Sequence, residues 1–191
     1  LFGEAIASRQ TMQVEEMAMT VFAALVVPSM LSVFVLMADL EHARLYMFLP
    51  FVCAFTSDAF ALFAGMRFGK HKLAPKVSPK KTVEGAIGGL LGGVIGMTVF
   101  KLVADSMAHT LTVYPPIEMA AGPQISWGAV FALGIIGSTI SQIGDLSFSV
   151  IKREFGVKDY GNLLPGHGGI LDRFDSVTFV APFVWLALQL L

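Results

Sequence analysis

The sequence is poor in charge and in cysteine. Only 14% of its 191 residues are charged, whereas soluble domains contain roughly 25%, so an ordinary water-soluble fold is not expected. Cys53 is the single cysteine, which excludes an intrachain disulfide. The chain also lacks a Walker A loop, a cluster of cysteine and histidine, and a His-Glu-x-x-His sequence, so we expect neither a P-loop nor a zinc site. The net charge of −1 gives no sign of a nucleic-acid partner.

Apolar sequence is what the chain has in abundance. Hydrophobic residues make up 55% of it, and the mean hydropathy is +0.72. A helix that spans a membrane needs about 20 mostly apolar residues. Stretches of this kind occupy residues 20–38, 45–66, 83–104, 126–151 and 176–191. We therefore predict an all-α fold, a polytopic transmembrane bundle with about five spans.

Lysine and arginine orient these predicted spans. Residues 67–82 and 152–175 form two basic loops, whereas the segment 105–126 between them has neither lysine nor arginine. Because basic residues collect in cytoplasmic loops, we expect both basic loops to face the cytoplasm. In the third span, glycines at 88, 92 and 96 predict the close approach of another helix.

Two carboxylates lie inside predicted spans. A carboxylate there costs at least about 2.5 kcal/mol, so it normally faces a partner or a cavity. Asp58 lies in the second span and suits either a hydrogen-bonded contact between helices or a functional cavity. Asp145 lies toward the cytoplasmic end of the fourth span, on the helix face that carries Ser138 and Ser141. This polar face favours a functional role for Asp145.

Both basic loops are suited to phosphate. Ser78, Lys80, Lys81 and Thr82 directly precede the third span, and a helix N-terminus attracts anions; membrane orientation alone would also explain the lysines. The second loop mixes cations, glycines and the carboxylates of Asp159, Asp172 and Asp175. Magnesium prefers one or two carboxylates together with substrate phosphates. The residues alone therefore indicate a cytoplasm-facing site for a phosphate-rich ligand and a divalent metal, and a transporter for an anionic solute fits almost as well.

The segment 149–176, SVIKREFGVKDYGNLLPGHGGILDRFDS, resembles the signature of the phosphatidate cytidylyltransferases, also called CDP-diacylglycerol synthases. The stretch 57–85 is similar to the same family, and the resemblance covers most of residues 55–190. The signature positions are Ser149, Lys152, Arg153, Lys158, Asp159, His167, Gly168, Gly169, Asp172, Arg173 and Asp175.

This resemblance implies that CTP and phosphatidic acid react to give CDP-diacylglycerol and pyrophosphate. It also implies a magnesium ion, with potassium at the same centre, a homodimer, and a bacterial inner membrane with the site facing the cytoplasm. Asp145 and Asp172 would hold the metal, and Lys152 and Arg173 would join them in catalysis. The expected substrate-binding residues are Asp58, Ser78, Lys80, Lys81, Thr82, Ser149, Arg153, Lys158, His167, Gly168, Gly169 and Asp175.

On this interpretation, residues 1–191 form a single transmembrane catalytic domain, the C-terminal part of a longer enzyme. Residues 67–82 and 152–175 are its functional cytoplasmic loops. Two alternatives stay open. One is a related CTP-dependent enzyme that acts on a polyprenol or an ether lipid, and the other is a membrane carrier of a phosphorylated solute.

Overall fold

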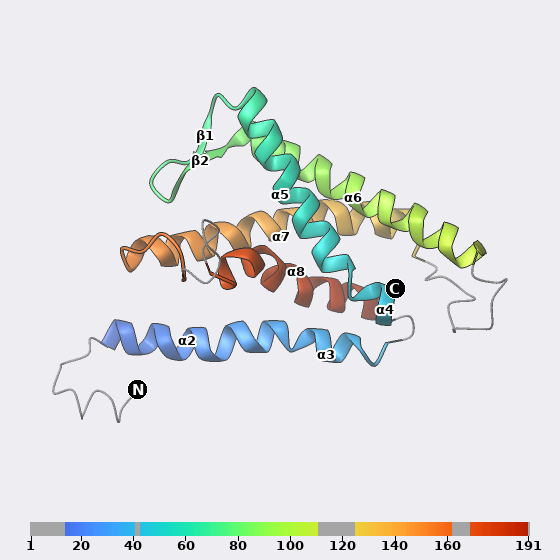
Figure 1. The fold of residues 1–191 in the computed structure, drawn as a ribbon, viewed down its shortest axis with the longest axis horizontal. Helices are drawn as coiled ribbons and strands as arrows, with labels where there is room; N and C mark the ends of the chain where they lie inside the picture. The colour runs from blue at the N-terminus through green and yellow to red at the C-terminus, as the bar shows by residue number, and fades with distance from the viewer. Residues whose placement is uncertain (1–13, 41–42, 111–124, 162–168, 191) are drawn as a thin grey trace.

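The computed structural model describes residues 14–40, 43–110, 125–161 and 169–190 (Figure 1). Helices account for most of this part of the chain, which confirms the all-α prediction. The elements in chain order are α2 (Val14–Leu31), α3 (Val33–Met37), α4 (Ala43–Tyr46), α5 (Leu49–Phe68), β1 (Lys72–Ala74), β2 (Ser78–Thr82), α6 (Val83–Thr110), α7 (Trp127–Glu154) and α8 (Leu171–Gln189).

Four helical segments of the described chain are long and apolar enough to cross a membrane. They are Met19–Met37, Leu49–Phe68, Val83–Ser106 and Trp127–Glu154, and they correspond to the first four predicted spans. The fifth predicted span is helical as α8 but does not belong to this set. Its first turns carry Asp172, Arg173 and Asp175, which shortens the apolar part of the helix. The chain is an integral membrane protein.

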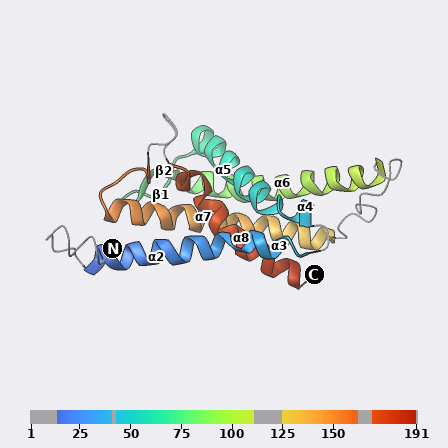
Figure 2. The same cartoon turned by 60° about the horizontal axis from the view of Figure 1, so that its bottom comes forward.

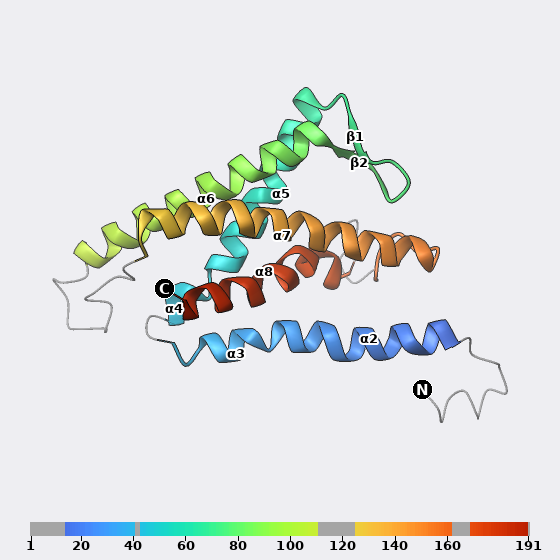
Figure 3. The ribbon, with the colours of Figure 1, turned by 180° about the vertical axis from the view of Figure 1, so that it is seen from behind.

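The ends of the long helices reach beyond the apolar layer. Helices α6 and α7 have 28 residues each, or about 42 Å of helix, while the hydrocarbon core of a bilayer is about 30 Å thick. Figures 1 and 3 show that the start of α6, the end of α7 and the start of α8 lie at the same end of the molecule as the hairpin β1–β2. The two predicted basic loops therefore share one end of the bundle.

The first basic loop contains a small antiparallel sheet that the sequence reading did not include. Strand β1 pairs with β2, with Lys72 opposite Thr82 and Ala74 opposite Ser78. The connecting turn is closed by a 3.2 Å hydrogen bond from the Val77 N–H to the Ala74 carbonyl. Pro75 occupies the second position of this turn, where its fixed backbone angle is favourable. The turn holds the loop in a defined shape beside the helix ends.

Small residues let α5, α6 and α7 pack closely. A Cβ atom at Gly92 would overlap Phe60, and one at Gly96 would overlap Thr56, both of α5. On the adjacent face of α6, a Cβ atom at Gly93 would overlap Ser138 of α7. The predicted close approach at the glycines of the third span is confirmed, and it packs α5 and α7 against adjacent faces of α6.

The apolar core lies where α3, α5 and α8 meet. Met37, Leu49, Val177 and Val180 are fully buried there. Helices α2 and α3 pack against α8, which lies beside them in Figure 1 and crosses them obliquely in Figure 2. The helical backbone is interrupted between α2 and α3 at Ser32. This core fixes α8 against α5, which sets the position of the carboxylates at the start of α8.

Candidate functional site

A cavity of about 620 Å³ opens at the hairpin end of the bundle. Helices α5, α6, α7 and α8 and the hairpin all contribute to its wall. Side chains that carry charge line much of it, and the remaining wall is mostly apolar. The charged residues are Asp58, Lys72, Lys80, Lys81, Asp145, Asp172 and Asp175, and the large apolar ones are Leu62, Met66, Leu73 and Leu146.

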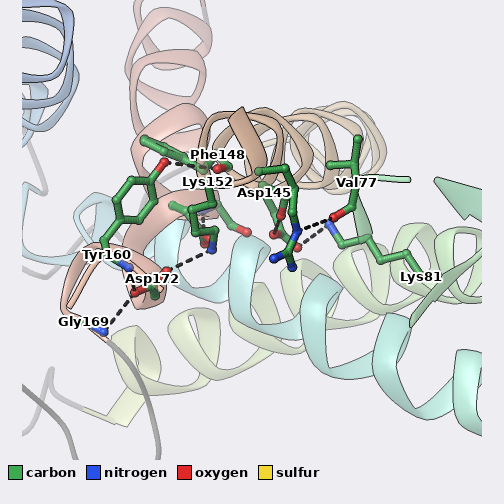
Figure 4. A network of polar contacts seen from close by, with 12 residues as sticks. Val77, Lys81, Asp145, Phe148, Lys152, Tyr160, Gly169 and Asp172 are labelled. Atoms are coloured by element: carbon green, nitrogen blue, oxygen red, sulfur yellow. Dashed lines mark hydrogen bonds and ion pairs between the residues drawn. The ribbon is translucent and has the colours of Figure 1, made fainter. Parts of the chain in front are cut away.

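Asp145 reaches the cavity from α7. The same face of α7 buries the small residues Gly134, Ser138 and Ser141. Asp145 follows them on this face, as the helical spacing predicts. Asp145 forms an ion pair with Lys81 of the hairpin, and Ser149, one turn further along α7, donates a 3.4 Å hydrogen bond to it. Figure 4 shows the lysine reaching across to α7. The pair joins the first predicted basic loop to α7.

Asp172 is held by three donors at the start of α8 (Figure 4). Lys152 Nζ lies 2.9 Å from Oδ1, and the backbone N–H groups of Tyr160 and Gly169 donate to Oδ2 at 2.8 Å and 2.9 Å. Burial alone would raise the pKa of this carboxyl, but the Lys152 and backbone hydrogen bonds outweigh it and lower the pKa below its ordinary value. Asp172 is therefore fixed as an oriented anion.

Asp58 and Asp175 complete the acidic part of the wall. Asp58 comes from α5 and Asp175 from α8. Burial raises the pKa of Asp175 to about 7, and the nearby Asp145 carboxylate adds to this effect. Carboxylates that repel one another in a confined space favour the binding of a cation between them. Asp58 thus lines the cavity.

The hairpin is anchored to the helices at several points. The Thr82 hydroxyl accepts a 3.1 Å hydrogen bond from the Gly85 N–H, so this residue caps the start of α6. Arg153, in the last turn of α7, donates from Nε to the Val77 carbonyl at 3.1 Å. His71 Nδ1 lies 2.6 Å from Glu84 Oε1. These contacts hold Lys80 and Lys81 over the cavity.

The structure brings most of the predicted site residues together. Asp58, Lys80, Lys81, Thr82, Asp145, Asp172 and Asp175 line the cavity, and Lys152, Ser149 and Gly169 contact its carboxylates. Ser78, Lys158 and Arg173 are described but do not line it. His167 and Gly168 lie outside the described residues.

Sequence reasoning missed three residues at the site. Lys72 lines the cavity but was considered only for membrane orientation. Gln142 lines it too and donates a 3.1 Å hydrogen bond to the Ala86 carbonyl of α6; its position one turn before Asp145 was the available signal. Tyr160 contacts both Asp172 and Lys152, and nothing in its local sequence indicated this.

The donor set suits magnesium. Within the described part of the chain, no group of three or more Asp, Glu, His or Cys side chains is arranged to enclose a metal ion. Magnesium does not need such an enclosure, because it binds through one or two carboxylates, substrate phosphates and water. A carboxylate has about four lone-pair sites, and three donors reach Asp172. Each of Asp145 and Asp172 therefore keeps an acceptor site.

The model of the cytidylyltransferase family matches residues 1–191. The chain belongs to the cytidylyltransferase family.

Relatives within this family share much of the chain. A phosphatidate cytidylyltransferase of Bacillus subtilis strain 168 is 36% identical over 183 residues, 95% of this chain and 62% of that protein. One from Haemophilus influenzae is 39% identical over 145 residues, 76% of this chain and 46% of that protein. One from Staphylococcus saprophyticus is 41% identical over 139 residues, 73% of this chain and 47% of that protein. This member of the cytidylyltransferase family thus spans 46% to 62% of the length of these relatives.

Proposed function

We propose that this chain carries the active site of a phosphatidate cytidylyltransferase, which makes CDP-diacylglycerol and pyrophosphate from CTP and phosphatidic acid in phospholipid biosynthesis. The observation that carries the proposal is the cavity in which Asp145 and Asp172 lie among Lys72, Lys80 and Lys81 at one end of a membrane bundle. Relatives named for this activity support it.

The wall of the cavity suits a lipid phosphate and a nucleotide together. Leu62, Met66 and Leu73 line it on the side of α5 and the hairpin, and Leu62 and Met66 are 60% and 67% exposed. Apolar residues beside lysines match a substrate with acyl chains and an anionic headgroup. We expect the site to face the cytoplasm of a bacterial inner membrane. CTP is dissolved in the cytosol and phosphatidic acid stays in the bilayer, so the two can meet only at that surface.

The reaction needs positioning and charge neutralisation more than a protein nucleophile. A lipid phosphate oxygen attacks the α-phosphorus of CTP, and the bond to the departing pyrophosphate breaks. Lys80, Lys81 and Lys152 would hold the phosphates against their mutual repulsion. Asp145 and Asp172 would hold magnesium, which, when bound, neutralises charge on the phosphate oxygens. Potassium at the same centre and a homodimer remain part of the proposal.

The test is an assay of the whole protein in nanodiscs. Labelled CTP, phosphatidic acid and magnesium should give CDP-diacylglycerol, and chelation by EDTA should stop its formation. Asp145→Asn should abolish turnover while the protein still inserts into the membrane. Uptake of a phosphorylated solute by vesicles, without any CDP-lipid, would favour a carrier and overturn the proposal.

A further inference from the structure

Tyr160 touches both members of the Lys152–Asp172 pair, although it does not line the cavity. Its backbone N–H donates to Asp172 Oδ2 at 2.8 Å. Its ring lies beneath Lys152, with Nζ 5.3 Å from the ring centroid. In Figure 4 the ring and the carboxylate lie on the same side of the lysine. One residue therefore helps to set the direction of both charged groups.

The Tyr160 ring is itself held firmly. Its hydroxyl donates to the Phe148 carbonyl at 3.1 Å, one helical turn before Lys152 on α7. The ring meets Phe148 edge to face, with centroids 5.8 Å apart. Phe148 in turn meets Phe179 of α8 in the same way, at 5.9 Å. The aromatic contacts tie the segment after α7 to both α7 and α8, so the ring is a rigid support.

A ring is a suitable support for a lysine that must bind phosphate. The ammonium group has three N–H donors, and one of them is directed to Asp172. The face of an aromatic ring attracts a cation through its quadrupole without accepting a strong hydrogen bond. A second carboxylate in the same place would compete with a phosphate for the remaining donors. The ring orients Lys152 and leaves those donors available.

We propose that Tyr160 is a positioning residue that directs Lys152 and Asp172 toward the substrate phosphates. The inference rests on the proposed function, because it needs a nucleotide phosphate as the partner of Lys152. It predicts that the aromatic ring matters more than the hydroxyl. It also predicts that the effect of Tyr160 on nucleotide binding passes through Lys152.

The test compares CTP binding in two backgrounds. Tyr160→Phe and Tyr160→Leu are made in the whole protein and again with Lys152→Met, and the dissociation constant for CTP with magnesium is measured by calorimetry in nanodiscs. Loss of a cation–π contact corresponds to an increase of about 2- to 30-fold in the dissociation constant. Tyr160→Leu should weaken binding about tenfold and lower kcat, and Tyr160→Phe should stay within about threefold. Phe155→Leu, at an exposed aromatic just after α7, is the matched control and should change nothing.

The double variant separates positioning from a general structural role. With Lys152→Met, Tyr160→Leu should weaken CTP binding no further. An equal loss in both backgrounds, or a Tyr160→Leu protein that binds CTP normally, would overturn the proposal. If the original protein binds no CTP, the proposed function itself fails, and this inference fails with it.

A fluorination series provides a second measurement if Tyr160→Leu does not fold. Phenylalanine analogues with increasing ring fluorination at position 160 keep the shape of the ring and weaken its attraction for a cation. CTP affinity should fall with each added fluorine. A constant affinity across the series would overturn the role of the ring.

Discussion

Replacement of Asp172 by asparagine tests the central geometry. The side chains of Lys152 and Asp172 are only 11% and 7% exposed, so the pair is largely removed from water. Asparagine keeps one acceptor oxygen but loses the negative charge, which leaves the Lys152 ammonium without its counter-charge. Removal of one partner from a buried pair costs about 3–5 kcal/mol. Because this pair borders an open cavity, we expect the free energy of unfolding to fall by about half of that.

Activity should fall far more than stability. The variant removes a proposed metal ligand and misdirects Lys152, two groups that would stabilise charge in the transition state. Loss of one such interaction typically costs about 10²- to 10³-fold in kcat. We therefore expect Asp172→Asn to insert and fold, with a lower melting temperature, and to form CDP-diacylglycerol at less than about 1% of the original rate. Product formation with labelled CTP and thermal unfolding in detergent measure the two effects.

Asp105→Asn is the matched control. Asp105 also pairs with a lysine, Lys101, at 3.1 Å, but near the opposite end of α6 and with 41% exposure. A pair this exposed contributes about 0–1 kcal/mol, so turnover and melting temperature should barely change. Near-normal turnover in Asp172→Asn, with unchanged dependence on magnesium, would refute the assignment of this carboxylate.

Three further predictions test the cap, the helix packing and the acidic wall. Thr82→Val should lower the stability by about 1 kcal/mol through loss of the α6 cap, as measured by thermal unfolding; an unchanged melting temperature would show that the Thr82 hydroxyl does not stabilise the start of α6. Gly92→Leu should prevent α5 from packing on α6 and abolish folding, as judged by gel filtration, whereas Gly128→Leu should be tolerated because nothing but the Ser126 hydroxyl, at 4.0 Å, lies near the added Cβ. With its pKa raised to about 7, folded Asp175 keeps its proton at pH values where the unfolded chain has lost it, so stability should fall as the pH rises from about 4 to 7. Asp175→Asn should flatten this part of the profile of melting temperature against pH, and an unchanged slope would contradict this role of Asp175.

The sequence predicted the parts of the fold that depend on local pattern. Apolar runs placed the first four spans, and the glycine spacing predicted the close face of α6. The charges at the start of α8 were counted as part of a loop, so their effect on the fifth span was not weighed. Hairpin pairing was missed because it depends on hydrogen bonds between Lys72–Ala74 and Ser78–Thr82, which have no apolar alternation to reveal them.

Long-range contacts limited the prediction of the site. The lysines at 80 and 81 were recognised as a pair, but the sequence could not show that Lys81 would meet Asp145, 64 residues away. The same holds for Arg153, which was expected at the substrate and donates to the Val77 carbonyl. Such contacts depend on how the helices are packed, and that packing is set by side chains far from the site.

The charge balance of the cavity connects these contacts to the chemistry. The lysines suited to bind phosphate are also the partners of the carboxylates, since Lys81 pairs with Asp145 and Lys152 with Asp172. An ammonium group cannot fully neutralise a carboxylate and a triphosphate at once. If a nucleotide and a lipid phosphate bind together as proposed, the cavity would gain negative charge that these lysines alone cannot balance. A divalent cation held by Asp145 and Asp172 would supply the missing positive charge, so we expect CTP to bind weakly without magnesium and much more tightly with it.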